Sequence, residues 1–155
     1  MYRFLGKIEV KTDNKGRVFI PASYRKLLER SGEEILLLRV DEVNRCISVY
    51  PESVWEKRNE ELTSKLNLWD TKDMMLYRKY TSETDVLEID ASGRILLQKK
   101  YLDLLKIESS ALFVGTGECF EIWSKDVFDA FVCSPEEFEQ GIQERMGNQP
   151  QNREI

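Results

Sequence analysis

Residues 9–28, EVKTDNKGRVFIPASYRKLL, and residues 86–105, VLEIDASGRILLQKKYLDLL, are two copies of one pattern that decides the fold. With a shift of 77 residues, six aligned positions are identical: Asp13/Asp90, Gly16/Gly93, Arg17/Arg94, Tyr24/Tyr101, Leu27/Leu104 and Leu28/Leu105. A second pair of blocks, CISVYPESVW at 46–55 and CFEIWSKDVF at 119–128, recurs in the same order with a shift of 73. This repetition predicts a tandem duplication of a unit of about 60 residues.

Each copy predicts a hairpin, a short helix, a second hairpin and a second helix. Asp13–Gly16 supplies turn residues between two apolar strands, and Pro21 suits the first turn of a helix that ends near Ser31-Gly32. Pro51 opens another helix after the second strand pair. The predicted strands are 9–12, 17–20, 34–40, 45–50, 84–89, 94–97, 110–115 and 118–123, and the predicted helices of the second copy are 98–106 and 125–133, the latter with Ser124 as N-cap.

The two copies set the domain organisation. Residues 1–63 form the first half and 83–133 the second, joined across 64–82 by a linking helix that Asp70 caps. A C-terminal helix over 134–147 carries Phe138, Ile142 and Met146, and the polar tail 148–155 is predicted to be disordered. Halves this small bury too little apolar surface to be stable alone, so they should share one core. The fold class predicted is mainly β with α (α+β), an interleaved β-barrel with peripheral helices.

Composition excludes most catalytic and metal chemistry. The chain has 155 residues and no histidine, which excludes Ser-His-Asp, Cys-His and His-zinc sites. Cys46, Cys119 and Cys133 form no CxxC motif and predict reduced thiols in a cytoplasmic protein. The longest apolar runs are four residues, far short of a membrane span. We therefore expect no enzyme activity, cofactor, metal, small-molecule substrate or membrane contact.

The charge is distributed unevenly. The net charge of −5 combines 23 Lys and Arg with 28 Asp and Glu. Residues 1–30 contain eight basic and three acidic residues, a local charge of +5, which leaves −10 for the rest of the chain. Residues 118–144 contain eight acids and one lysine. The N-terminal segment is therefore predicted to bind anions, whereas the acidic stretch is predicted to form a solvated face.

The repeated Asp-x-x-Gly-Arg motif is the feature with chemical character. The Asp side chain can close the turn through backbone N–H groups, and the glycine supplies a positive φ. The arginine leaves the loop tip, where it suits phosphate or the O6/N7 edge of guanine. An ordinary hairpin turn with a surface ion pair is the alternative. Duplication favours the functional reading, because turn geometry alone would retain Asp and Gly but not Arg. Lys15, within the first loop, and Lys7 and Lys11, close to it, also favour it.

Other motifs have simpler interpretations. Gly115-Thr116-Gly117 invites a nucleotide-loop reading, but a hairpin turn is the better prediction. Trp55, Trp69 and Trp123 could stack bases, yet two of them stand in the repeated strand-to-helix block and all three are predicted to be packing residues.

The sequence strongly resembles the MraZ family, whose fold is the swapped-hairpin barrel related to AbrB-type regulators. TDNKGRVFIP at 12–21 and EIDASGRILL at 88–97 carry the match, supported by Val49-Tyr50-Pro51 with Trp55-Glu56 and by EIWS at 121–124. The resemblance extends from about residue 1 to residue 146.

The resemblance implies a bacterial transcriptional regulator of the division and cell-wall gene cluster. It would bind G-containing direct repeats in double-stranded DNA upstream of that cluster, as a homo-oligomeric ring that is cytoplasmic and nucleoid-associated. The DNA contacts it implies are Lys15, Arg17 and Arg94, to which the local charge adds Lys7 and Lys11, while Asp13, Gly16, Asp90 and Gly93 shape the loops. Ser92 and Gln98 replace the Lys15 and Pro21 of the first copy, so the second loop is less cationic.

A protein-interaction module is the alternative function. It would be an antitoxin-like or scaffold protein that uses the barrel or the acidic C-terminal helix to bind a partner. Salt dependence separates the two functions, because phosphate contacts predict a steep loss of DNA affinity with added salt.

Overall fold

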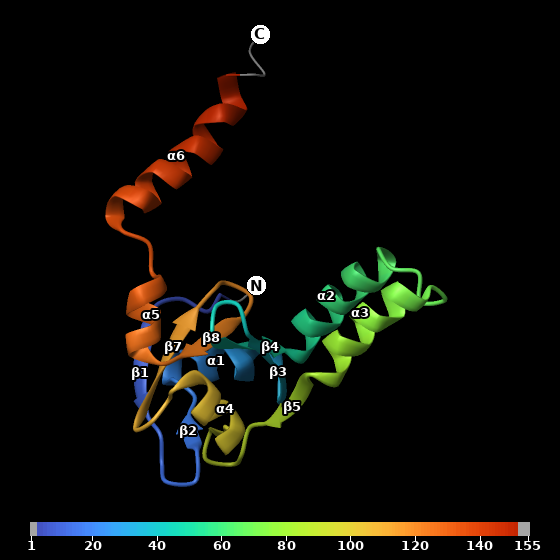
Figure 1. Cartoon of the computed structure of the whole chain (residues 1–155). Coiled ribbons are helices and arrows are strands. Elements are labelled where there is room, and N and C mark those ends of the chain that lie inside the picture. Colours follow the sequence, from blue (N-terminus) through green and yellow to red (C-terminus); the bar gives the residue numbers. More distant parts are fainter. Residues whose placement is uncertain (1–2, 152–155) are drawn as a thin grey trace.

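The computed structural model describes residues 3–151, and its elements follow the predicted order (Figure 1). The first half contains β1 (Lys7–Lys11), β2 (Arg17–Phe19), α1 (Ala22–Ser31), β3 (Ile35–Asp41), β4 (Cys46–Pro51) and α2 (Glu52–Ser64). After α3 (Thr71–Ser82), the second half contains β5 (Thr84–Glu88), β6 (Arg94–Leu96), α4 (Lys99–Leu105), β7 (Ser110–Gly115), β8 (Phe120–Trp123) and α5 (Lys125–Phe131). The chain then continues into α6 (Pro135–Gln151).

The strands of the two halves are interleaved. A six-stranded antiparallel sheet has the order β1-β7-β8-β4-β3-β5, and β2 pairs with β6 in a separate two-stranded ribbon. The α+β class and the tandem repeat are thus confirmed. Among the described residues, the strand pairing forms an open sheet with edges β1 and β5 plus a ribbon, not the continuous closed ring of a barrel.

Each Asp-x-x-Gly-Arg loop reverses the chain as predicted, but the strands on either side of it do not form the predicted hairpin ladder with each other. β1 pairs with β7 and β5 with β3, while an isolated bridge from Thr12 to Val18 links the strands on either side of the first loop. Turn residues specify a reversal of the chain, but they do not specify the partner of a strand. Here β2 and β6 have only three residues each and pair with each other. This pairing directs the side chains of Val18 and Ile95 into the core that the two halves share.

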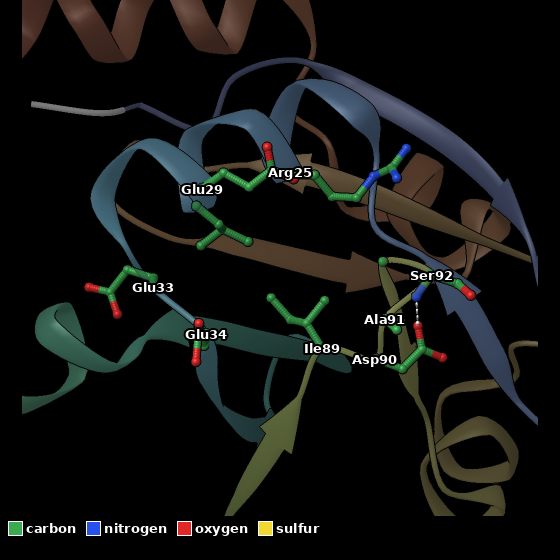
Figure 2. A pocket seen from close by; sticks show the side chains of 10 residues that line it. Arg25, Glu29, Glu33, Glu34, Ile89, Asp90, Ala91 and Ser92 are labelled. Atoms are coloured by element: carbon green, nitrogen blue, oxygen red, sulfur yellow. Dashed lines mark hydrogen bonds between the residues drawn. The ribbon is translucent and has the colours of Figure 1, made fainter.

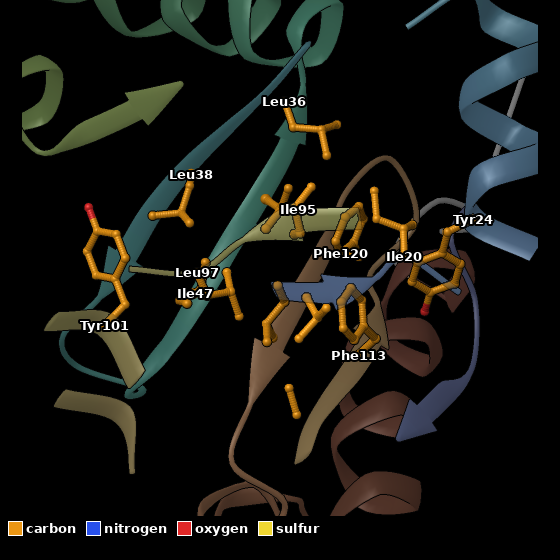
Figure 3. Close-up of a cluster of buried hydrophobic side chains, with 14 of the residues drawn as sticks. Ile20, Tyr24, Leu36, Leu38, Ile47, Ile95, Leu97, Tyr101, Phe113 and Phe120 are labelled. Atoms are coloured by element: carbon orange, nitrogen blue, oxygen red, sulfur yellow. The ribbon is translucent and has the colours of Figure 1, made fainter. Parts of the chain in front are cut away.

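One core serves both halves. Tyr24 is fully buried, with its ring centroid 5.1 Å from that of Phe4 and 5.2 Å from that of Phe120 (Figure 3). The equivalent residues Ile20 and Leu97 are both fully buried in the same cluster. Because residues from each half fill the space left by the other, neither half can bury its apolar side chains alone.

The linking segment forms a helical hairpin with α2. The side chain of Asp70 caps α3 as predicted, accepting hydrogen bonds from the backbone N–H groups of Lys72 and Asp73 at 3.1 Å. Trp55 of α2 stacks on Tyr80 of α3, with the ring centroids 6.1 Å apart. Figure 1 shows this hairpin projecting from one side of the molecule and α6 from another. None of the described helices has the length and apolar character needed to cross a membrane.

Three further predictions need correction. α6 continues to Gln151, four residues past the predicted end at 147, and residues 152–155 lie outside the described residues. Ser124 stands at the N-cap position of α5 but makes no side-chain capping bond. Trp55 and Trp123 pack against aromatic neighbours as predicted, whereas Trp69, at the α2–α3 turn, is 97% exposed. Thr116 and Gly117 lie in the turn between β7 and β8, as predicted, and Gly115 is the last residue of β7.

Candidate nucleic-acid interface

The carboxylate of Asp13 holds the first loop closed. One oxygen, Oδ1, accepts the backbone N–H groups of Lys15 and Arg17, each at 2.9 Å. The other oxygen, Oδ2, accepts Nε–H of Arg17 at 2.7 Å. Gly16 adopts a φ of 86°, a left-handed conformation that a side chain would strain. Arg17 is therefore positioned by the loop from both its backbone and its guanidinium.

The second loop repeats this geometry. Asp90 accepts the backbone N–H groups of Ser92 and Arg94 at 2.9 Å and Nε–H of Arg94 at 2.9 Å. Gly93 has a φ of 84°. The repeated sequence motif is thus a repeated structure, in which an aspartate sets an arginine in place.

The β2–β6 ribbon brings the two arginines onto one face. Its register pairs Arg17 with Leu96 and Phe19 with Arg94. The central pair, Val18 and Ile95, faces the core, so the outer pairs share the opposite face of the ribbon. Phe19 is 48% and Leu96 51% exposed, and Cζ of Arg94 lies 5.7 Å from the Phe19 ring centroid. Two arginines on one diagonal thus alternate with two exposed apolar side chains on the other.

Each loop is anchored to the opposite half of the chain. The backbone N–H of Leu97 donates to the carbonyl of Gly16 at 2.8 Å, and the N–H of Ile20 donates to the carbonyl of Gly93 at 3.0 Å. A Cβ atom built on Gly16 would lie 2.4 Å from the Leu97 carbonyl oxygen. The two loops are therefore fixed relative to each other by direct backbone contacts.

The structure separates the three predicted lysines. Lys15 is exposed in the first loop beside Arg17. Lys11 ends β1 two residues before Asp13, whereas Lys7 begins β1 and lies roughly 13 Å further along the strand. Nζ of Lys7 is 5.6 Å from the centroid of the Phe128 ring, on the acidic α5. The structure groups Lys15 with Arg17 but directs Lys7 towards the opposite end of β1.

Both loop carboxylates are strongly stabilised in the ionised form. The backbone N–H of Arg17 is the main group that lowers the pKa of Asp13, which falls to about 2, with further contributions from the Arg17 side chain and the Lys15 N–H. The backbone N–H of Arg94 likewise lowers the pKa of Asp90. Both aspartates are therefore charged throughout the physiological range.

These shifts predict a pH-insensitive interface. Because the pKa of Asp13 is lower in the folded chain than the ordinary value near 3.9, its contribution to stability is complete above about pH 4 and is lost as the pH falls through about 2. With no histidine in the chain and both loop aspartates ionised, the charge of these two carboxylates should stay constant between about pH 5 and 8. Titrating the Asp13 carboxyl carbon by NMR should give a midpoint near 2. A midpoint near 4 would mean that the loop is not held by this carboxylate.

Sequence reasoning missed one residue of the site. Arg25 of α1 lies over the second loop, where a Cβ atom built on Gly93 would be 2.7 Å from its Cδ atom. A pocket of about 450 Å³ opens between α1 and this loop (Figure 2). The shift of 77 aligns Arg25 with Leu102, and this difference between the copies is the signal that could have found it.

Two consecutive stretches of the chain, residues 3–79 and 80–148, match one family model, described as "MraZ protein, putative antitoxin-like". The chain belongs to the MraZ family. The boundary between the two matches lies within α3, so each match to the MraZ model covers one of the repeats.

Relatives named "Transcriptional regulator MraZ" match over most of their length. The protein of Phocaeicola vulgatus is 43% identical over 94% of both chains, and that of Bacteroides thetaiotaomicron is 43% identical over 96% of both. The protein of Xanthomonas oryzae is 32% identical over 83% of this chain and 87% of its own. The MraZ repeat thus accounts for nearly the whole chain.

The acidic and sulfur-containing side chains of the described residues do not gather into a metal site. Among residues 3–151, no three His, Cys, Asp or Glu side chains gather as a metal site would require. Cys46 and Cys119 are buried free thiols, and burial is the main cause that raises the pKa of each.

Proposed function

We propose that this chain is a DNA-binding transcriptional regulator that contacts DNA through the loops at 13–17 and 90–94. This proposal rests mainly on the β2–β6 ribbon, which places Arg17 and Arg94 on one exposed face. Each arginine donates a hydrogen bond from Nε to the aspartate of its own loop. A guanidinium held at Nε can still use its two terminal nitrogens to contact phosphate or guanine O6 and N7. The relatives named as transcriptional regulators support this role.

The shape of this face fits the major groove. B-DNA admits a two-stranded β-ribbon there, and arginine is the side chain best suited to guanine. Phe19 and Leu96 flank the arginines and offer an apolar contact for thymine methyl groups. We propose G-containing direct repeats upstream of the division and cell-wall gene cluster as the target, bound in the cytoplasm at the nucleoid.

Salt dependence tests this function. Labelled upstream DNA should bind the wild-type protein with an affinity that falls steeply between 50 and 200 mM salt, because each phosphate contact releases counterions. The alternative, a partner-binding module of the kind that the antitoxin-like family description suggests, predicts no DNA affinity to lose. No catalytic step is part of either function.

The proposed regulator acts as an oligomer. One ribbon neutralises few phosphates, whereas several linked copies on successive repeats raise the effective concentration and thus the avidity. Two unpaired apolar surfaces support self-assembly. The α6 face consists of Phe138, Ile142 and Met146, which recur every four residues and are all exposed. The hairpin tip consists of Leu68, Trp69, Met75 and Leu76, which are also exposed.

These two surfaces are complementary in charge. Residues 65–79, around the hairpin tip, contain four basic and two acidic residues, whereas 135–147 of α6 contain four acids and one arginine. Figure 1 shows α6 and the α2–α3 hairpin, which carry these surfaces, as separate projections. We propose that α6 of one copy packs on the hairpin tip of the next, since a head-to-tail contact between different surfaces generates a ring when its rotation closes.

An acidic substitution in the α6 face should dissociate the assembly. Ile142→Asp places a charge in the proposed contact but leaves the core untouched, since Ile142 is exposed and does not belong to the core cluster. Light scattering after size exclusion should then report the 18.2 kDa monomer instead of the wild-type oligomer. Val43→Asp, in the exposed β3–β4 turn, is the matched control and should assemble normally. An intact oligomer in the Ile142 variant would contradict this interface.

A further inference from the structure

The two loops carry different numbers of cations. The first contains Lys15 and Arg17, whereas the second has Ser92 at the position of Lys15 and keeps only Arg94. Both loops share the same aspartate contacts and the same left-handed glycine. If the loops face DNA as a pair, the second loop lacks one phosphate contact that the first can make.

Arg25 supplies a cation beside this second loop from the other half of the chain. A Cβ atom on Gly93 would lie 2.7 Å from Cδ and 2.9 Å from Nη1 of Arg25, so the arginine lies directly against the loop backbone. The N–H of Ile20, just before α1, donates to the Gly93 carbonyl at 3.0 Å and fixes this approach. Figure 2 shows the Arg25 side chain extending away from Glu29 and towards the side of the pocket that holds Ser92.

One guanidinium nitrogen of Arg25 has no acceptor among the described residues. Within residues 3–151 its buried Nε atom has no hydrogen-bond partner, and the arginine forms no salt bridge. Glu29, Glu33 and Glu34 line the same pocket without pairing with it. Because no carboxylate of the described residues forms an ion pair with Arg25, an anion at the terminal nitrogens of its guanidinium would balance the charge.

Packing alone does not require an arginine at this position. Leu102 is the equivalent of Arg25 in the second copy, and its Cδ1 atom would lie 3.2 Å from a Cβ atom on Gly16. A leucine therefore covers the loop glycine in one half, and an arginine covers it in the other. Both residues pack against a loop glycine, and this packing does not require the positive charge of Arg25.

We propose that Arg25 is a DNA-phosphate contact of the second loop and replaces the cation that Ser92 does not provide. With this contribution each loop presents two cations, Lys15 and Arg17 on one side and Arg25 and Arg94 on the other. The inference rests on the proposed DNA-binding function, and it assigns a residue of α1 to the DNA surface.

The equivalent residue in the second copy suggests the substitution that tests this proposal. Arg25→Leu copies the packing of Leu102 and removes only the charge. On DNA with a single repeat, we expect about tenfold weaker binding and a fall of about one in the slope of log affinity against log salt. The thermal midpoint should stay close to that of the wild type. Lys26→Leu, which removes an exposed charge from the neighbouring position of α1, should leave the slope unchanged.

A second variant, with the opposite substitution at the equivalent position of the second copy, provides an independent test. Leu102→Arg adds a cation beside the first loop and should raise the salt slope by about one. If Arg25→Leu binds with the wild-type affinity and slope, Arg25 only covers Gly93 and the inference fails. If the wild-type protein shows no salt-dependent binding at all, the proposed function itself fails, which is a different result. Should Arg25→Leu unfold, an unchanged slope in Leu102→Arg would overturn the inference.

Discussion

Replacing Arg17 with alanine should abolish measurable binding to the upstream repeat DNA and leave the oligomer intact. A bidentate arginine contact with guanine contributes about 1–3 kcal/mol per site, and the loss recurs in every subunit that engages a repeat. For two engaged subunits this corresponds to a loss of at least about thirtyfold, and of several hundredfold near the middle of that range, about 2 kcal/mol per site. The Arg17 guanidinium contacts Asp13 at the surface, so its removal exposes no core residue.

The loss should be specific to the loop arginines. Arg94→Ala should have a weaker effect, because the Arg94 side chain is 27% exposed and that of Arg17 is 36% exposed. Arg30→Ala removes an exposed charge from the last turn of α1 and serves as the control, which should bind almost normally. Fluorescence anisotropy measures the affinities, and light scattering checks the assembly. Wild-type affinity in the Arg17 variant would contradict the assignment of this loop to DNA.

Replacing Gly16 with alanine should destabilise the fold by about 3 kcal/mol, which lowers Tm by roughly 10 °C in a chain of this size. Two effects combine at this position. The φ of 86° costs a residue with a side chain about 1–2 kcal/mol. The new Cβ atom would also lie 2.4 Å from the backbone carbonyl oxygen of Leu97, which cannot rotate away. The anchor between the halves must therefore shift.

Gly117 provides the matched control. Its φ of 93° imposes a similar conformational strain, but a Cβ atom there would have no neighbour within 4 Å. Gly117→Ala should therefore show the strain alone, about 1–2 kcal/mol. Gly93→Ala should fall between the two, because its Cβ atom would meet the flexible side chain of Arg25. Thermal unfolding gives the comparison, and an equal loss at Gly16 and Gly117 would show that the backbone contact with Leu97 does not matter.

Local chemistry made much of the fold predictable. The turn residues Asp13 to Gly16, the helix start at Pro21 and the cap at Asp70 act within a few residues, and the structure places a loop or helix at each. The repeat was visible because its two copies keep both the Asp-x-x-Gly-Arg spacing and the apolar pattern. The close match between the loops at Asp13 and Asp90 follows from the same local rules.

Features that depend on long-range packing could not be predicted in the same way. The pairing of β1 with β7 depends on residues more than a hundred positions away, and no local residue specifies it. Lys7 and Lys15 belong to the same basic segment of the sequence, but Lys7 lies at the far end of β1, where it contacts Phe128 of α5. Arg25 belongs to the first half of the chain and contacts Gly93 of the second half, a contact that depends on how the two halves pack together. Trp69 looked like its packed counterparts, although the end of the helical hairpin leaves it exposed.

The central claim is that the two loops read repeated sequences in DNA, and a competition on the DNA upstream of this chain's own gene tests it most directly. Two fragments of equal length and composition would be compared, one with its short direct repeats intact and one with those repeats scrambled. We predict that the wild-type protein binds the intact fragment at least about tenfold more tightly at physiological salt. Equal affinity for both fragments, or no binding to either at low salt, would contradict the claim.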